Sequence, residues 1–129
     1  MAKIGIIGWG VVGQAIGRGF ETKGHQVSWW DKYKKGPHSL DKVIKKSEYI
    51  FLCLPTPMFS DESGIDLSII DGTVAKIAPK IKKTDKILVI KSTVIPGTTA
   101  SYKKKYPEVN FAMNPEFLTE SNALGDFLK

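Results

Sequence analysis

Apolar residues follow two patterns that alternate along the chain. Short, nearly unbroken apolar runs rich in isoleucine and valine are typical of buried strands, and they occupy residues 3–7, 26–30, 49–54, 86–91 and 109–113. Between the runs, apolar residues recur at helical spacing in residues 11–24, 39–46 and 66–79, and a short helix through about residue 105 is expected after Pro96 and Gly97. This alternation predicts one α/β domain with a Rossmann-like, doubly wound parallel sheet of about five strands.

The same pattern predicts a strand order and several element ends. We expect the order 3-2-1-4-5, which leaves the fifth strand at an edge. Ser39 and Asp66 are expected to cap the second and third helices, and Pro79 to end the third. Because an uncovered edge strand can pair with another chain, self-association or a partner fragment at strand five is a hypothesis that sedimentation velocity would test.

The amino-acid composition limits the classes of partner that the chain is expected to bind. The 19 basic residues exceed the 13 acidic ones, but Arg18 is the only arginine and the lysines are scattered. Nucleic-acid recognition favours arginines with exposed aromatic residues, so no nucleic-acid partner is expected, whereas an anionic small ligand accounts for the excess equally well. No apolar run approaches the roughly 20 residues of a membrane span, and no secretory signal is evident. We expect a soluble, cytoplasmic protein without a membrane partner or a metal site.

A glycine-rich turn follows the first apolar run directly and opens the first predicted helix. In this GxGxxG context, Gly8 can make the tight turn, Gly10 lets the backbone approach a pyrophosphate, and Gly13 permits close packing of helix on strand. The pyrophosphate would rest on the helix amino terminus. The residues expected at the cofactor from this turn are Gly8, Trp9, Gly10, Val11, Val12 and Gly13.

Asp31 stands at the end of the second run, where a carboxylate can accept both hydroxyls of an adenosine ribose. This position favours NAD as the cofactor, since a 2′-phosphate would meet a negative charge. Lys32, Lys34 and Lys35 are near enough in sequence that NADP is disfavoured rather than excluded. The alternative interpretation of Asp31 is a solvated turn residue.

Three further run ends carry unusual sequences. They are Leu-Pro-Thr-Pro at 54–57, Lys-Ser-Thr-Val-Ile-Pro-Gly-Thr-Thr at 91–99 and Asn-Pro-Glu-Phe-Leu at 114–118. Together with the glycine turn, and with Ala123, Asp126 and Phe127 after them, they resemble the UDP-glucose/GDP-mannose dehydrogenase family. The resemblance runs through the whole chain in order, so residues 1–129 look like that family's amino-terminal NAD-binding domain.

The resemblance implies roles for specific residues. Beside the turn and Asp31, it implies cofactor contacts from Leu54, Pro55, Thr56, Ser92, Thr93 and Glu120. Thr93, Glu116 and Glu120 would have supporting catalytic roles, in which the first two help to activate the water that hydrolyses a thioester. The implied sugar-nucleotide contacts are Glu116, Phe117 and Leu118.

The family's nucleophilic cysteine, central helix and carboxy-terminal sugar-nucleotide domain have no counterpart in these residues. Cys53 lies inside an apolar run without a nearby activating residue, so we expect a buried thiol rather than a substitute nucleophile. The resemblance implies that the complete enzyme, in polysaccharide biosynthesis, oxidises the primary alcohol of a UDP-glucose-like sugar nucleotide to a carboxylate. This chain alone is expected to be inactive and to meet a sugar nucleotide only beside a complementing catalytic domain.

Two other interpretations stay open. One is a stand-alone NAD-binding or regulatory module, or a remnant, without dehydrogenase activity. The other is a relative of the β-hydroxyacid dehydrogenases, whose dinucleotide domain also begins with a GxGxxG turn, although the segments 91–93 and 114–118 fit that family poorly.

Overall fold

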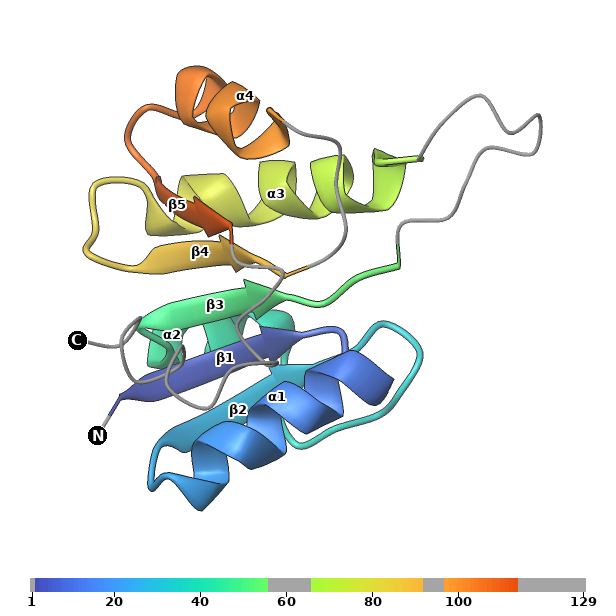
Figure 1. Ribbon diagram of the computed structural model, residues 1–129. Helices are drawn as coiled ribbons and strands as arrows, with labels where there is room; N and C mark the ends of the chain where they lie inside the picture. The colour runs from blue at the N-terminus through green and yellow to red at the C-terminus, as the bar shows by residue number, and fades with distance from the viewer. Residues whose placement is uncertain (1, 56–65, 92–96, 114–129) are drawn as a thin grey trace.

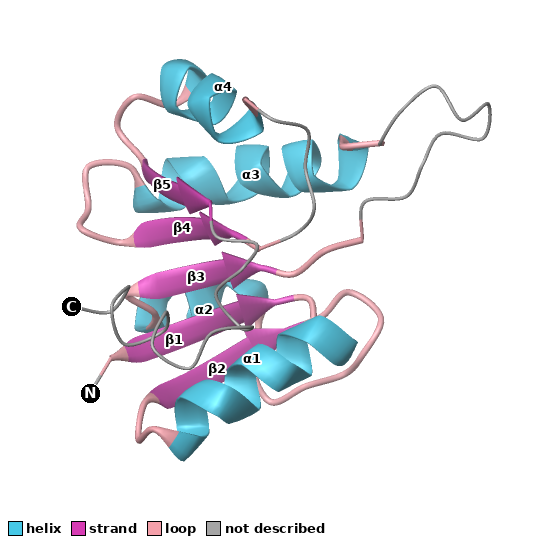
Figure 2. Cartoon of the chain, viewed as in Figure 1, coloured by secondary structure: helices cyan, strands magenta, loops and turns pink. Residues whose placement is uncertain are grey.

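The computed structural model describes residues 2–55, 66–91 and 97–113 of the 129-residue chain. These residues form a parallel β-sheet with helices on both faces (Figures 1 and 2). The elements are β1 (Lys3–Ile7), α1 (Val11–Thr22), β2 (Gln26–Trp30), α2 (Leu40–Lys46), β3 (Tyr49–Leu52), α3 (Ser68–Ile81), β4 (Ile87–Ile90), α4 (Thr98–Lys105) and β5 (Asn110–Met113). The predicted Rossmann-like α/β class is confirmed.

The predicted strand order 3-2-1-4-5 is wrong. The sheet has the order β2-β1-β3-β4-β5, so β1 lies between β2 and β3. Three of the four residues of β3 are fully buried, as an interior strand requires, whereas only Ser28 of the five residues of β2 is buried and Gln26 is exposed, so β2 takes the edge. The link between these strands, residues 31–48, contains one helix, α2, of seven residues.

A common doubly wound sheet has the strand order 3-2-1-4-5-6. If its outermost strand, the third along the chain, is removed and the remaining strands are renumbered, the result is the order observed here. In the loop after β2, Gly36 packs directly against the Trp29 ring. At the other end of the sheet, β5 pairs with β4 alone within the described residues, so its predicted edge position is confirmed. Association through that edge stays a prediction.

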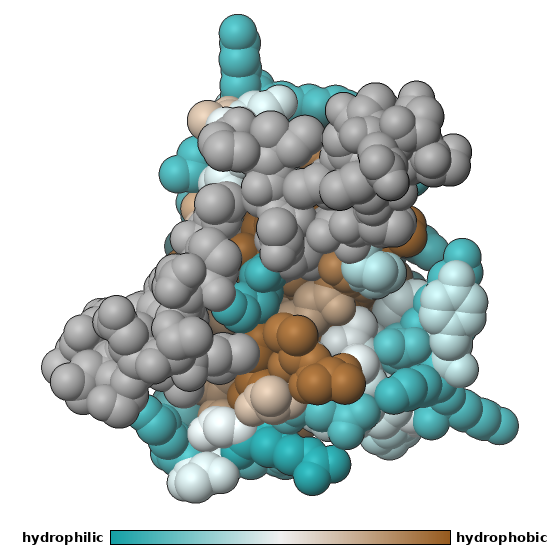
Figure 3. Space-filling view, turned by 45° about the vertical axis from the view of Figure 1, so that its right-hand side comes forward, coloured by the Kyte–Doolittle hydropathy of each residue, from teal (hydrophilic) through white to brown (hydrophobic). Residues whose placement is uncertain are grey.

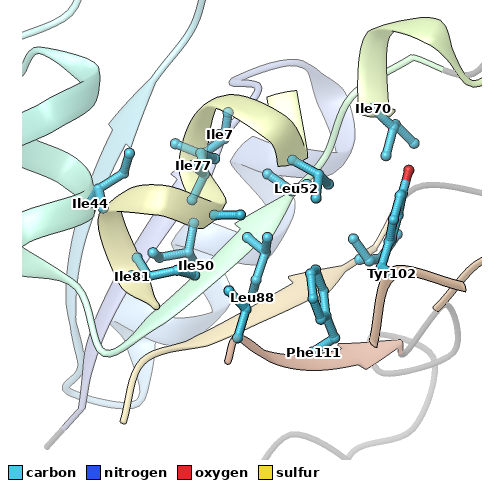
Figure 4. Close-up of a cluster of buried hydrophobic side chains, with 14 of the residues drawn as sticks. Ile7, Ile44, Ile50, Leu52, Ile70, Ile77, Ile81, Leu88, Tyr102 and Phe111 are labelled. Carbon is cyan, nitrogen blue, oxygen red and sulfur yellow. The ribbon is translucent and has the colours of Figure 1, made fainter. Parts of the chain in front are cut away.

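The two faces of the sheet are covered unequally. In Figure 1, α1 crosses one face over β1 and β2, while α2, α3 and α4 lie on the other. Figure 4 shows side chains of β1, β3 and β4 converging beneath α3. The fully buried members of this larger cluster include Ile7, Ile50, Leu52, Val74, Ile77 and Leu88. The smaller cluster under α1 contains Ile4, Ile6, Ile16, Phe20, Phe51 and Val89.

Polar contacts fix the ends and spacing of the helices. The Ser39 hydroxyl accepts a hydrogen bond from the Lys42 amide at 3.2 Å, as predicted for a cap. The prediction that Asp66 caps the third helix is wrong, because Leu67 is the cap residue of α3, although the Asp66 carboxylate accepts the Ser68 amide at 2.9 Å just before it. The Tyr102 hydroxyl donates to Asp71, which ties α4 to α3. Among the described helices, none has the length and apolar character needed to cross a membrane.

The prediction that Pro79 ends the third helix is wrong, because α3 continues through Pro79 to Ile81. Proline in the last turn removes one amide donor, but the next turn still closes, with the Lys82 amide donating to the Ala78 carbonyl at 3.0 Å. The Ile81 side chain is fully buried, so its packing keeps the last residues helical despite the proline.

Candidate functional site

The site expected from the sequence lies where the carboxyl ends of β1, β2 and β3 meet. The glycine turn follows β1, Asp31 follows β2, and Leu54 comes two residues after β3. Figure 3 views the molecule obliquely from the side of these strand ends and shows apolar surface beside the grey residues. Val11 and Val12 are 89% and 50% exposed, an unusual degree for valines at the start of a helix.

Gly8 makes the tight turn that brings these strand ends together. Its φ of +102° lies in the region that favours glycine. Its amide donates to the Trp30 carbonyl at 2.8 Å, and a Cβ at this position would collide with the Cys53 carbonyl and approach a Leu54 methyl to 3.3 Å. Gly8 is therefore held between the ends of β2 and β3 with no room for a side chain.

Gly13 and Gly10 are glycines for different reasons. A Cβ on Gly13 would overlap the Gly8 carbonyl oxygen and lie 3.2 Å from Ile6, so its absence lets α1 pack on the turn. Gly10 has an ordinary backbone, with φ −88°, and a Cβ there would have no atom within 4 Å. Neither strain nor packing in the described residues explains glycine at position 10, whereas an approaching ligand would.

The amino terminus of α1 is suited to an anion. Gly10 is the cap residue and provides no side-chain hydrogen bond, and the first turn contains no acidic residue. Within the described residues, α1 itself therefore supplies no anionic partner to its leading amide groups or to the positive end of its dipole. A pyrophosphate fits this arrangement, because it supplies both the charge and the acceptor atoms.

Asp31 is half-buried and organises the turn. One carboxylate oxygen, Oδ2, accepts the Trp9 amide at 2.7 Å. The other, Oδ1, accepts the amides of Tyr33 at 2.8 Å and Lys34 at 3.1 Å. A carboxylate oxygen has two lone pairs, so Oδ1 is saturated and Oδ2 keeps one for a ligand. Within the described residues, Asp31 thus has one acceptor position left for a ligand, on Oδ2, and the expectation that it accepts both hydroxyls of an adenosine ribose stays a prediction.

Hydrogen bonds hold the Trp9 backbone at both its amide and its carbonyl. Its carbonyl accepts hydrogen bonds from the Gln14 amide group at 3.1 Å and from the Lys34 ammonium at 3.0 Å, opposite the bond to Asp31. The Trp9 ring stacks on Trp29, with ring centres 4.9 Å apart and planes 9° from parallel, and covers Gly17. Sequence reasoning missed Gln14 altogether and missed the contact of Lys34 with the Trp9 carbonyl, because nothing in their spacing shows that both side chains turn back to one carbonyl.

The structure brings together only part of the expected site. The turn residues, Asp31, Leu54 and the exposed Pro55 share one edge of the sheet. The remaining expected residues lie outside the described part of the chain: Thr56, Ser92, Thr93, Glu116, Phe117, Leu118 and Glu120.

Cys53 is not an activated thiol. It follows β3 and packs against the cluster under α1, and burial raises the pKa of its thiol to about 12. Lys91 opposes this rise more weakly. At neutral pH the side chain is protonated, so it cannot act as a thiolate nucleophile.

The chain matches the family model described as the UDP-glucose/GDP-mannose dehydrogenase family, NAD binding domain, over residues 34–129. It is 45% identical over 89 residues to an uncharacterised protein of Methanocaldococcus jannaschii, covering 67% of this chain and 10% of that protein. It is 42% identical over 93 residues to a UDP-glucose 6-dehydrogenase of Rickettsia bellii, covering 68% and 21% respectively. The chain thus spans about a fifth or less of these relatives.

Solved structures share the fold. A GDP-mannose dehydrogenase from Pseudomonas aeruginosa, solved as a ternary complex, superposes with a TM-score of 0.73 at 23% identity, covering 96% of this chain and 38% of that one. A 3-hydroxyisobutyrate dehydrogenase from Mycobacterium tuberculosis gives 0.67 at 12% identity, covering 88% and 39%. At these identities the likeness establishes the fold alone.

Proposed function

This chain belongs to the UDP-glucose/GDP-mannose dehydrogenase family, as a form of its NAD-binding domain, and from that premise we propose that the edge formed by the glycine turn and Asp31 binds NAD. The observation that carries the proposal is the open space beside Gly10, next to an uncapped helix terminus. A pyrophosphate accounts for both features, and bound cofactor would also cover the exposed side chains of Val11 and Val12.

The charge at Asp31 supports NAD over NADP. Its free lone pair on Oδ2 can accept a ribose hydroxyl, while a phosphate at the same place would be repelled. We propose that NAD is the preferred cofactor for this reason. When bound, NAD supplies a hydride acceptor, and the part of this chain is to hold and orient it.

The activity of the whole protein is a further part of the proposal. The resemblance at residues 91–99 and 114–118 supports oxidation of a sugar-nucleotide alcohol, with supporting roles for Thr93, Glu116 and Glu120. Because the pKa of Cys53 is raised to about 12, the nucleophile has to come from elsewhere. These residues alone are expected to produce no NADH from UDP-glucose and NAD, and a complementing catalytic half supplied in trans is expected to restore turnover.

The test is calorimetric titration of the chain with NAD and, separately, with NADP. Circular dichroism on the same sample establishes that the chain is folded. The proposal expects saturable binding of NAD that is tighter than binding of NADP. A folded chain that binds neither dinucleotide would overturn it and would favour the remnant interpretation.

A further inference from the structure

We propose that Lys34 sets how strongly this domain discriminates at the 2′ position of the adenosine ribose, by giving a 2′-phosphate a cationic partner beside Asp31. The inference rests on the proposed function, since it concerns the same cofactor edge. It goes further than the proposed function because it names the residue that determines how well the domain binds NADP.

The first step is the limited capacity of Asp31. Three backbone amides already bind the carboxylate, one on Oδ2 and two on Oδ1, so a single lone pair faces the ligand. These amides also place positive partial charges around the carboxylate, which weakens the repulsion that it exerts on a phosphate. Asp31 therefore favours NAD less strictly than a carboxylate that accepts both ribose hydroxyls.

The second step is the position of Lys34. Its ammonium donates to the Trp9 carbonyl at 3.0 Å, while Asp31 accepts the amide of the same Trp9 residue at 2.7 Å. A cation and an anion thus flank one residue of the glycine turn. In the proposed pose, a ribose with one hydroxyl on Asp31 has its 2′ substituent on the side of Lys34, which lines the same hollow.

The third step separates Lys34 from the other lysines of its loop. The Lys32 ammonium lies over the Tyr33 ring, 5.7 Å from its centre, and Lys35 makes no hydrogen bond or ion pair within the described residues. All three lysines line a hollow of about 390 Å³ together with Asp31. Of the three, only Lys34 is held on the glycine turn.

A purely structural role for Lys34 makes a different prediction. If the lysine only holds the Trp9 carbonyl in place, its removal loosens the turn and weakens the binding of NAD and the binding of NADP by the same factor. If it receives the 2′-phosphate, its removal weakens NADP much more than NAD, because an ammonium binds a phosphate more strongly than a hydroxyl. The ratio of the two dissociation constants distinguishes these roles.

The experiment is calorimetric titration of NAD and NADP into the wild-type chain, Lys34→Ala and Lys35→Ala. Lys35→Ala is the matched control, because it removes the same charge one residue away. For Lys34→Ala we expect NADP to bind about tenfold more weakly and NAD less than about threefold more weakly, with Lys34→Arg recovering most of the NADP affinity. For Lys35→Ala we expect changes of less than about twofold for both dinucleotides.

Equal losses for the two cofactors in Lys34→Ala, or the same NADP loss in Lys35→Ala, would overturn the assignment of Lys34 while leaving the NAD site intact. A wild-type chain that binds neither dinucleotide would overturn the proposed function and this inference together. The two failures are therefore distinguishable in one set of titrations.

Discussion

The two faces of the sheet depend on different features of the sequence. Under α2, α3 and α4, buried aliphatic side chains fill a volume, and the sequence there is set by apolar character and size. Under α1, the structure depends on side chains that are absent at Gly8 and Gly13, on space left open at Gly10 and on a clamped Trp9 peptide. Packing is therefore sufficient to explain the first face, and close approaches explain Gly8 and Gly13 on the second, whereas the open space at Gly10 is the feature that the proposed ligand accounts for.

The largest loss of stability is expected on the packed face. Ile77 is fully buried between α3 and the sheet, so Ile77→Ala removes apolar contacts and leaves a cavity. We expect a loss of about 4 kcal/mol in the free energy of unfolding. Urea titration followed by circular dichroism measures it. A loss below about 1 kcal/mol would mean that this face is not the main core.

The variant Gly13→Ala tests the face of the sheet that α1 covers. The new Cβ would overlap the Gly8 carbonyl oxygen, which is backbone and cannot turn aside. Either α1 or the turn has to shift, and we expect a cost of about 3 kcal/mol together with weaker NAD binding. The same denaturation measurement checks this, with Gly19→Ala as the control, since a Cβ at Gly19 meets nothing within 4 Å. Equal stability of the two variants would contradict the close approach.

Asp31→Ala tests the link between the clamp and the cofactor. The backbone amides of Trp9, Tyr33 and Lys34 lose their acceptor but remain accessible to water, so we expect a loss of only about 1 kcal/mol. NAD affinity should fall about tenfold and the preference over NADP should narrow, as calorimetry would show. Unchanged affinity and preference would make Asp31 a turn residue only.

Local sequence patterns were enough to predict the fold class and much of the site. The five strands and four helices formed within a few residues of their predicted ranges, and the glycine turn met Asp31 at the strand ends. These features depend on nearby residues, so the sequence shows them directly. The Ser39 cap is of the same kind.

The errors concern long-range choices. Whether β3 pairs beside β1 or β2 depends on which strand is the more apolar. β2 contains the polar residues Gln26 and Ser28 whereas β3 is apolar, which favours β3 as the interior strand. The predicted order followed a common fold instead of this comparison. The occupied lone pairs of Asp31 depend on how residues 31–34 turn back on themselves. Neither outcome can be read from spacing along the chain.

Gly10→Val tests the central claim most directly, because it has the smallest expected effect on stability and the largest on binding. The new Cβ enters space where no atom beyond the adjacent residues lies within 4 Å, at an ordinary φ of −88°, so the free energy of unfolding should change by less than about 1 kcal/mol. Titration of this variant with NAD, beside the wild type and Gly19→Val, should show loss of binding at Gly10 alone. A folded Gly10→Val that binds NAD as tightly as the wild type would contradict the account.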